Sequence, residues 1–252
     1  MFGAVVTTST GKLATMSNRV KTGIAGIDTM LDGGIPQGNQ VVIAGAPGTG
    51  KTLFAFEYIY KGAKLGEPGI FFSFNQDTES FLRTVKDTLT GFTDIDLLIE
   101  DKKLVILGYE ETKTFIQKGS ESTNYAFTGM ISQLQSRIED CQATRMAIDS
   151  LSYIKMYTKD PFEYRNLLTS LLIILGRQHV TSLITAEAGQ EADGIHQEFF
   201  IYDGVISMGS VHGSGNRVLS IRKMRGANHA HGIAQYRITP NGINVTTPQT
   251  QQ

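Results

Sequence analysis

Gly45 to Thr52 have the residue types and spacing needed to hold a chain of phosphate groups. They read GAPGTGKT and fit the pattern G-x-x-x-x-G-K-[ST]. Glycines let backbone N–H groups turn toward a phosphate without side-chain clashes, and a helix that starts there adds partial positive charge. Lys51 would contact the β- and γ-phosphates, and the Thr52 hydroxyl would bind Mg²⁺. The expected binding residues for a nucleoside triphosphate are Ala46, Pro47, Gly48, Thr49, Gly50, Lys51, Thr52 and Leu53.

Asp149 is the second residue whose position suggests chemistry. It ends the apolar segment RMAID, which begins at Arg145. An acid at the carboxyl end of a buried strand can hold Mg²⁺ through water beside a phosphate loop. The alternative is that Asp149 caps the following helix, because Asp is a good N-cap residue. Given the phosphate loop we favour the metal role, with Thr52 and Asp149 as the metal-site residues.

Strand-like and helix-like segments alternate around these residues. Short apolar runs, typical of strands buried on both faces, occur at 40–44, 69–74, 104–107, 145–149 and 180–186. Helical spacing of apolar residues occurs over 51–65, 78–89, 127–138 and 161–177. The end of the chain changes to short strands separated by Gly, Asn and His turns, at 204–209, 217–224, 234–238 and 242–245. This order predicts an α/β fold, with a mostly parallel sheet flanked by helices and a C-terminal antiparallel hairpin extension.

Length and composition limit the possible classes of protein. The chain has 252 residues, of which 40% are hydrophobic and 19% charged, as in a globular protein. We expect a flexible N-terminal extension over 1–17, one nucleotide-binding domain over 18–246, and a flexible tail over 247–252. The single cysteine, Cys141, excludes an internal disulfide. Since the sequence has neither a membrane-spanning apolar run nor a secretory signal, we expect a cytoplasmic protein.

Five further stretches of the sequence carry a family resemblance: TGIAGID at 22–28, LDGGIPQG at 31–38, GEPGIFFSF at 66–74, IDSLS at 148–152 and KMRGANH at 223–229. These stretches resemble those of RecA-superfamily ATPases, and the closest resemblance is to the KaiC-like proteins of archaea and cyanobacteria. The similarity runs from about Arg19 to Val245, and the chain looks like a single-domain member. The resemblance implies a RecA-like fold, ATP and Mg²⁺ as ligands, and a homo-oligomeric ring. Such rings are commonly hexameric, with ATP at the subunit interfaces.

The resemblance also assigns a role to two late basic residues. In relatives, a Lys-x-Arg on a late strand reaches the γ-phosphate bound by the neighbouring subunit, and the matching residues here are Lys223 and Arg225. Cations placed there would neutralise the charge that develops on the transferred phosphoryl group. Alternation along a strand would direct both side chains to one face. The alternative is a solvated basic edge strand, and the resemblance favours the role in trans.

The chain departs from the family pattern after its second predicted strand. Relatives carry two acidic residues there, one of which activates the attacking water, whereas this chain has Asn75 and Gln76. Gln76 could orient water, and Asp77 or Glu79 could replace the base, although we expect both acids to cap or open the next helix. Glu187 is a further acid on the expected γ-phosphate side, and its role stays open. The candidate catalytic residues are therefore Gln76, Asp77, Lys223 and Arg225, and we expect slow or absent hydrolysis with ATP binding retained.

Two functions follow, a slow ATPase ring and a nucleotide-dependent assembly or signalling module that binds ATP without useful turnover. A DNA recombinase is less favoured, because the net charge is −1 and the loop 189–200 carries Glu191, Asp193 and Glu198. That loop would face the central channel of a ring. His229 and His231 form only a weak metal signal, since no cysteine or carboxylate cluster accompanies them.

Overall fold

The computed structural model describes residues 18–110, 123–158, 160–188, 197–211 and 215–246. The expected terminal segments, 1–17 and 247–252, lie outside these ranges. The acidic residues Glu191 and Asp193 of the predicted channel loop also lie outside them.

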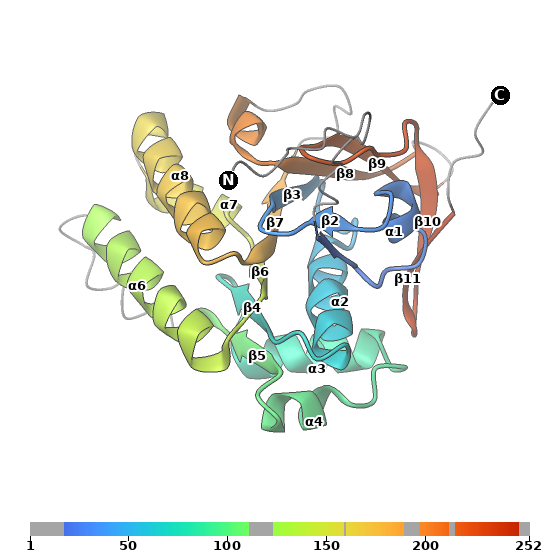
Figure 1. Ribbon diagram of the computed structural model, residues 1–252, viewed down its shortest axis with the longest axis horizontal. Coiled ribbons are helices and arrows are strands. Elements are labelled where there is room, and N and C mark those ends of the chain that lie inside the picture. Colours follow the sequence, from blue (N-terminus) through green and yellow to red (C-terminus); the bar gives the residue numbers. More distant parts are fainter. Residues whose placement is uncertain (1–17, 111–122, 159, 189–196, 212–214, 247–252) are drawn as a thin grey trace, which may run out of the picture.

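A nine-stranded sheet crosses the molecule in the order β11-β10-β9-β8-β3-β7-β6-β4-β5 (Figure 1). Its parallel strands are β3 (Gln40–Gly45), β4 (Gly69–Ser73), β5 (Leu104–Leu107), β6 (Arg145–Asp149), β7 (Thr181–Glu187) and β8 (Gly204–Ser210). The antiparallel extension consists of β9 (Arg217–Met224), β10 (Ala234–Thr239) and β11 (Gly242–Thr246). A small separate sheet pairs β1 (Arg19–Val20) with β2 (Ile35–Pro36). The predicted mostly parallel sheet with a C-terminal antiparallel extension is confirmed.

Helices cover both faces of the large sheet (Figure 1). One face carries α1 (Ile27–Met30), α2 (Lys51–Lys64), α3 (Thr78–Thr88) and α4 (Ile95–Glu100). The other face carries α6 (Thr123–Cys141), α7 (Ser152–Tyr157) and α8 (Pro161–Arg177), and a short 3₁₀ helix, η1 (Gln197–Ile201), precedes β8. The predicted helices over 51–65, 78–89 and 161–177 are present within about one residue at each end. The short helices α1, α4 and α7 were not predicted.

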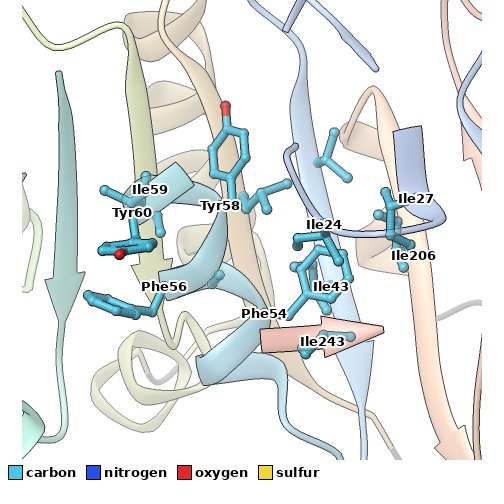
Figure 2. Close-up of a cluster of buried hydrophobic side chains, with 14 of the residues drawn as sticks. Ile24, Ile27, Ile43, Phe54, Phe56, Tyr58, Ile59, Tyr60, Ile206 and Ile243 are labelled. Atoms are coloured by element: carbon cyan, nitrogen blue, oxygen red, sulfur yellow. The ribbon is translucent and has the colours of Figure 1, made fainter. Parts of the chain in front are cut away.

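Each central strand contributes to two apolar cores, one on each face of the sheet. Val42 of β3 packs in the α6 and α8 core, whereas its neighbour Ile43 packs in the α2 core. This alternation explains why the strands read as continuous apolar runs. Figure 2 shows part of the α2 core, where Phe54 of α2 lies with Ile43 and with Ile243 of β11. Burial of α2 against the sheet therefore fixes the position of its first turn.

Parallel pairing brings the carboxyl ends of β3, β6 and β7 to one edge of the sheet. In register, Gly45 at the end of β3 lies opposite Glu187 at the end of β7. β6, which ends at Asp149, is the next strand beyond β7. The residues that follow β3 and those that end β6 and β7 are therefore neighbours, although they are far apart in the sequence.

Candidate functional site

The loop between β3 and α2 depends on the two glycines at its ends, Gly45 and Gly50. A Cβ atom on Gly45 would lie 2.2 Å from the carbonyl oxygen of Met208 in β8. Gly50 has a φ of +91°, and a Cβ atom there would lie 2.6 Å from Ile238 in β10. Gly45 has no space for a side chain beside the Met208 backbone, and the positive φ of Gly50 would strain any other residue, so the geometry of the loop itself requires glycine at both positions.

A hydrogen bond from the C-terminal extension supports this loop. The buried Tyr236 hydroxyl in β10 donates to the carbonyl oxygen of Thr49, and the Thr49 hydroxyl donates to Ala46 O at 2.8 Å. Burial raises the pKa of Tyr236 to about 12, so the phenol stays a donor at neutral pH. The sequence pattern did not single out Tyr236, since it is one apolar residue of an ordinary strand.

Lys51 lies at the start of α2 with its ammonium group against its own loop. Its Nζ donates to Gly45 O at 2.9 Å and to Ala46 O at 3.0 Å, and the residue is buried. Burial lowers the pKa of Lys51, while the negative charges of Glu187 and Asp149 oppose that shift. Phosphate oxygens are better partners for this buried cation than neutral carbonyls, because a charge-assisted hydrogen bond is stronger.

Thr52 and Asp149 are in direct contact, as expected for two residues of one metal site. The Thr52 hydroxyl donates to Asp149 Oδ2 at 2.9 Å, and the Thr185 hydroxyl of β7 donates to Oδ1. Burial raises the pKa of Asp149, whereas the hydrogen bonds from Thr185 and Thr52 lower it. Thr185 was not identified from the sequence, because a threonine in a strand that also contains Thr181 and Ser182 carries no local signal of this contact.

The oxygen atoms of Thr52 and Asp149 fit Mg²⁺, which is commonly held by one or two protein oxygens together with substrate phosphates and water. Among the described residues, no group of three or more His, Cys, Asp or Glu side chains could hold a metal ion. His229 and His231 lie close together, with ring centroids 5.1 Å apart, but no further ligand of that kind joins them in the part of the chain that the structure describes.

The three candidates that follow β4, which are Gln76, Asp77 and Glu79, have different surroundings. Asp77 is the N-cap of α3 and accepts a hydrogen bond from Ser80 N at 2.7 Å, which holds the pKa of its carboxyl below the ordinary value. Glu79 lies in the first turn of α3, beside Arg83 at 3.6 Å. Gln76 is half-buried, and its main chain bonds to Ser73 Oγ and to Tyr109 N. Both acids therefore have the helix-opening positions that the sequence predicted.

Lys223 and Arg225 converge on the segment before β8. Lys223 Nζ donates to Phe200 O at 3.1 Å, and Arg225 donates to the same carbonyl at 3.3 Å. Arg225 also pairs with Asp203 Oδ1 at 3.2 Å. Both side chains thus lie on one side of the sheet edge, although β9 ends at Met224, one residue before Arg225.

This pair is at the opposite end of the strands from the phosphate loop of the same chain. Lys223 is paired with Val205 near the start of β8, and Val205 is paired with Val42 near the start of β3. The loop begins beyond the other end of β3, at Gly45. The structure therefore brings together Lys51, Thr52 and Asp149, and it separates Lys223 and Arg225 from them.

Comparison with known proteins identifies the family of this chain. A family model described as "ATPase: KaiC" matches residues 20–250. The chain belongs to the KaiC-like ATPase family. Its predicted resemblance and its predicted RecA-like fold class are both confirmed.

Relatives of this KaiC-like chain include proteins of about its own length and longer proteins. The UPF0273 protein PH0284 of Pyrococcus horikoshii is 30% identical over 240 residues, covering 91% of this chain and 94% of that protein. A circadian clock oscillator protein KaiC of Parathermosynechococcus lividus is 31% identical over 238 residues, covering 89% of this chain but 42% of that protein. The crystal structure of KaiC-like protein PH0186 from P. horikoshii superposes with a TM-score of 0.78 at 30% identity, covering 91% of this chain and 99% of that one.

Among the described residues, no helix of this KaiC-like protein is long and apolar enough to cross a membrane.

Proposed function

We propose that this KaiC-like protein binds ATP with Mg²⁺ at the loop between β3 and α2 and hydrolyses it slowly. In this proposal the chain forms a homo-oligomeric ring, commonly hexameric in the family, with nucleotide at the subunit interfaces. The observation that carries it is the meeting of Lys51, Thr52 and Asp149 at the carboxyl edge of the sheet, beside a glycine-dependent loop. That arrangement has the donors, the cation and the metal-binding oxygens that a triphosphate needs.

Each residue of the site has a defined part in this function. The loop N–H groups and the first turn of α2 would surround the phosphates, and Lys51 would exchange its carbonyl contacts for phosphate oxygens. Thr52 and Asp149 would hold Mg²⁺, which supplies charge neutralisation on the phosphate oxygens when it is bound. Gln76 would orient the attacking water from the β4 side of the site.

Lys223 and Arg225 would act on the nucleotide of a neighbouring subunit. Their place at the far end of β3 and β8 supports this, because a reach to the loop of the same chain would have to span the length of the strands. Lys223 is partly exposed and Arg225 is exposed, and both side chains are directed to one side. Side chains that reach across a subunit interface need such positions. In this role they would neutralise charge that develops on the terminal phosphate.

The second candidate is an assembly or signalling module that binds ATP without useful turnover. It is supported by the amides Asn75 and Gln76 in place of an acidic pair, and by the engagement of Asp77 as a helix cap. ATP at the interfaces would then stabilise the ring by mass action alone. A DNA recombinase is less favoured, because the net charge of −1 supplies no broad positive surface.

Phosphate release measured beside molecular mass, with and without ATP and Mg²⁺, separates these candidates. ATP-dependent assembly with slow phosphate release that requires Lys223 and Arg225 supports the ATPase. ATP-dependent assembly without release supports the module. Absence of any ATP binding by the folded protein contradicts both.

A further inference from the structure

Glu187 ends the strand next to the phosphate loop. It is in register with Gly45, the first residue of the loop, and β7 is a direct neighbour of β3. The next residue, Ala188, donates its N–H to Gly45 O at 3.2 Å, and Lys51 Nζ contacts that same carbonyl oxygen at 2.9 Å. The main chain at Glu187 is also fixed by a hydrogen bond from its N–H to Ser152 Oγ at 2.9 Å. The backbone that carries this carboxylate is therefore held against the loop.

The alternation of β7 places the Glu187 side chain on the face of the site. Leu183 packs in the α2 core, Ile184 packs in the opposite core, and Thr185 contacts Asp149. Since residues two apart on a strand share a face, Glu187 points to the same side as Thr185, where Lys51 and Asp149 lie. Its side chain is exposed, beyond the end of the apolar core.

The hydrogen bonding of Glu187 differs from that of the other acids near the site. Asp149 accepts hydrogen bonds from Thr52 and Thr185, and Asp77 accepts one from the first turn of α3. No hydrogen bond joins the Glu187 carboxylate to another residue in the described part of the chain. Burial is the main cause of the pKa shifts of Lys51 and Asp149, and the negative charge of Glu187 raises the pKa of both, against the burial effect on Lys51 and in addition to it on Asp149. Glu187 is thus the described acid beside the loop that is neither a helix cap nor bonded to the predicted metal ligands.

We propose that Glu187 is the catalytic carboxylate that orients the attacking water and accepts its proton. The inference rests on the proposed function, since it requires ATP at the loop. The water oxygen forms a bond to the γ-phosphorus, and the bond from that phosphorus to the bridging oxygen breaks, with the electron pair leaving on ADP. One proton of the water passes to the Glu187 carboxylate. Gln76 would hold the same water from the other side, which an amide can do without accepting a proton.

The test compares Glu187→Gln with Glu139→Gln, a matched change at an exposed position on α6. Phosphate release with ATP and Mg²⁺ is measured beside the ATP dissociation constant from titration calorimetry. We expect Glu187→Gln to slow release about 100-fold, the usual scale for a lost general base. We expect its ATP dissociation constant to stay unchanged or to fall up to about threefold, because a negative charge beside the triphosphate is removed. Glu139→Gln should match the wild type in both measurements, and Glu187→Asp should be intermediate in release.

Slower turnover without weaker ATP binding is the signature of a residue that acts on the water. Release by Glu187→Gln within about twofold of the wild type would overturn the inference and leave ATP binding intact. A parallel loss of binding and release would also overturn it, since that is the result of a damaged loop. If the wild type binds ATP but releases no phosphate in a prolonged single turnover, Glu187 is not a working base, and the module function stands. If the wild type binds no ATP, the proposed function itself fails.

Discussion

At the scale of single residues, the site depends on a few polar atoms at the end of an apolar sheet. Asp149 is buried between two hydroxyl donors, Thr52 and Thr185, and its carboxylate is the expected partner of Mg²⁺. We predict that Asp149→Asn lowers ATP affinity at least about tenfold in Mg²⁺ and removes most of its dependence on Mg²⁺, since an amide is a weaker ligand. Nucleotide titrations with and without Mg²⁺ check this, with the exposed Asp140→Asn as control. A variant that keeps full dependence on Mg²⁺ would remove Asp149 from the metal site.

The sequence located the parts of this site that share one local motif or end a strand. Lys51 and Thr52 belong to a glycine-rich pattern that is specific for phosphate binding, and Asp149 is an acid at the end of a buried apolar run. Thr185 and Tyr236 were missed because their partners are 36 and 187 residues away along the chain. A threonine or tyrosine in a strand has no local signal that reveals such a contact. Only the strand order brings these pairs together.

At the scale of elements, the C-terminal extension supports the phosphate loop through β10. We predict that Tyr236→Phe, which removes the hydrogen bond to Thr49 O, weakens ATP binding by about threefold to tenfold. The loss of unfolding free energy should be about 1 kcal/mol, the usual net value of one hydrogen bond. Calorimetric titration and urea unfolding measure the two effects. Tyr236→Phe with unchanged ATP affinity would show that the loop holds its shape without β10.

Helix α2 carries a buried acid that makes the stability of the fold depend on pH. Glu57 Oε2 accepts a hydrogen bond from Ile243 N at 2.6 Å, Lys61 lies 4.0 Å away, and a Cβ on Gly242 would lie 2.2 Å from Oε1. Burial raises the pKa of Glu57 from 4.5 to about 7, against the opposing effects of Ile243 N–H and Lys61. The folded protein therefore favours the protonated form of Glu57. The stability that this form contributes is fully present below pH 4.5 and is lost as the pH rises through 7.

The matching variant is Glu57→Gln, which keeps the shape of the side chain without its charge. We compare the unfolding free energy of Glu57→Gln with that of the wild type at about pH 5 and at about pH 8. We predict that the difference in favour of the variant is larger at the higher pH by about 1 to 3 kcal/mol. Urea unfolding at both pH values measures the difference, with the exposed Glu100→Gln as control. An equal effect of Glu57→Gln at both pH values would show that Glu57 does not titrate in this range.

The longer elements were predictable, whereas the short ones were not. The strands from β3 to β7 and the helices α2 and α8 have enough apolar residues for their period to be read. Helix α1 has 4 residues, and α4 and α7 have 6 each, so none extends over two full turns. Their positions follow from tertiary packing, as at Ile95 and Leu98 of α4, which complete the α2 core.

At the scale of the whole molecule, the strand order explains why one chain would not complete its own site. Insertion of β3 between β7 and β8 is not visible in the sequence, because its neighbours come from segments more than 130 residues later. That order places the loop at one end of the sheet and Lys223 with Arg225 at the other. If the loop and the Lys223 and Arg225 pair act on one nucleotide, the site has to form between two copies of the chain.

A mixing experiment tests this division directly. Lys51→Ala removes the loop function and keeps the basic pair, whereas Arg225→Ala keeps the loop and removes one of the two cations. When each variant is measured separately, we expect its rate of phosphate release to be at least about tenfold lower than that of the wild type. In randomly mixed rings, about a quarter of the neighbouring pairs combine an intact loop with an intact Lys223 and Arg225, so release should recover toward about a quarter of the wild-type rate. Native mass spectrometry establishes that mixed rings form. Mixed rings contain interfaces at which an intact loop meets an intact Lys223 and Arg225. If such rings are no more active than the sum of the separate variants, Arg225 does not act on the nucleotide of a neighbouring subunit.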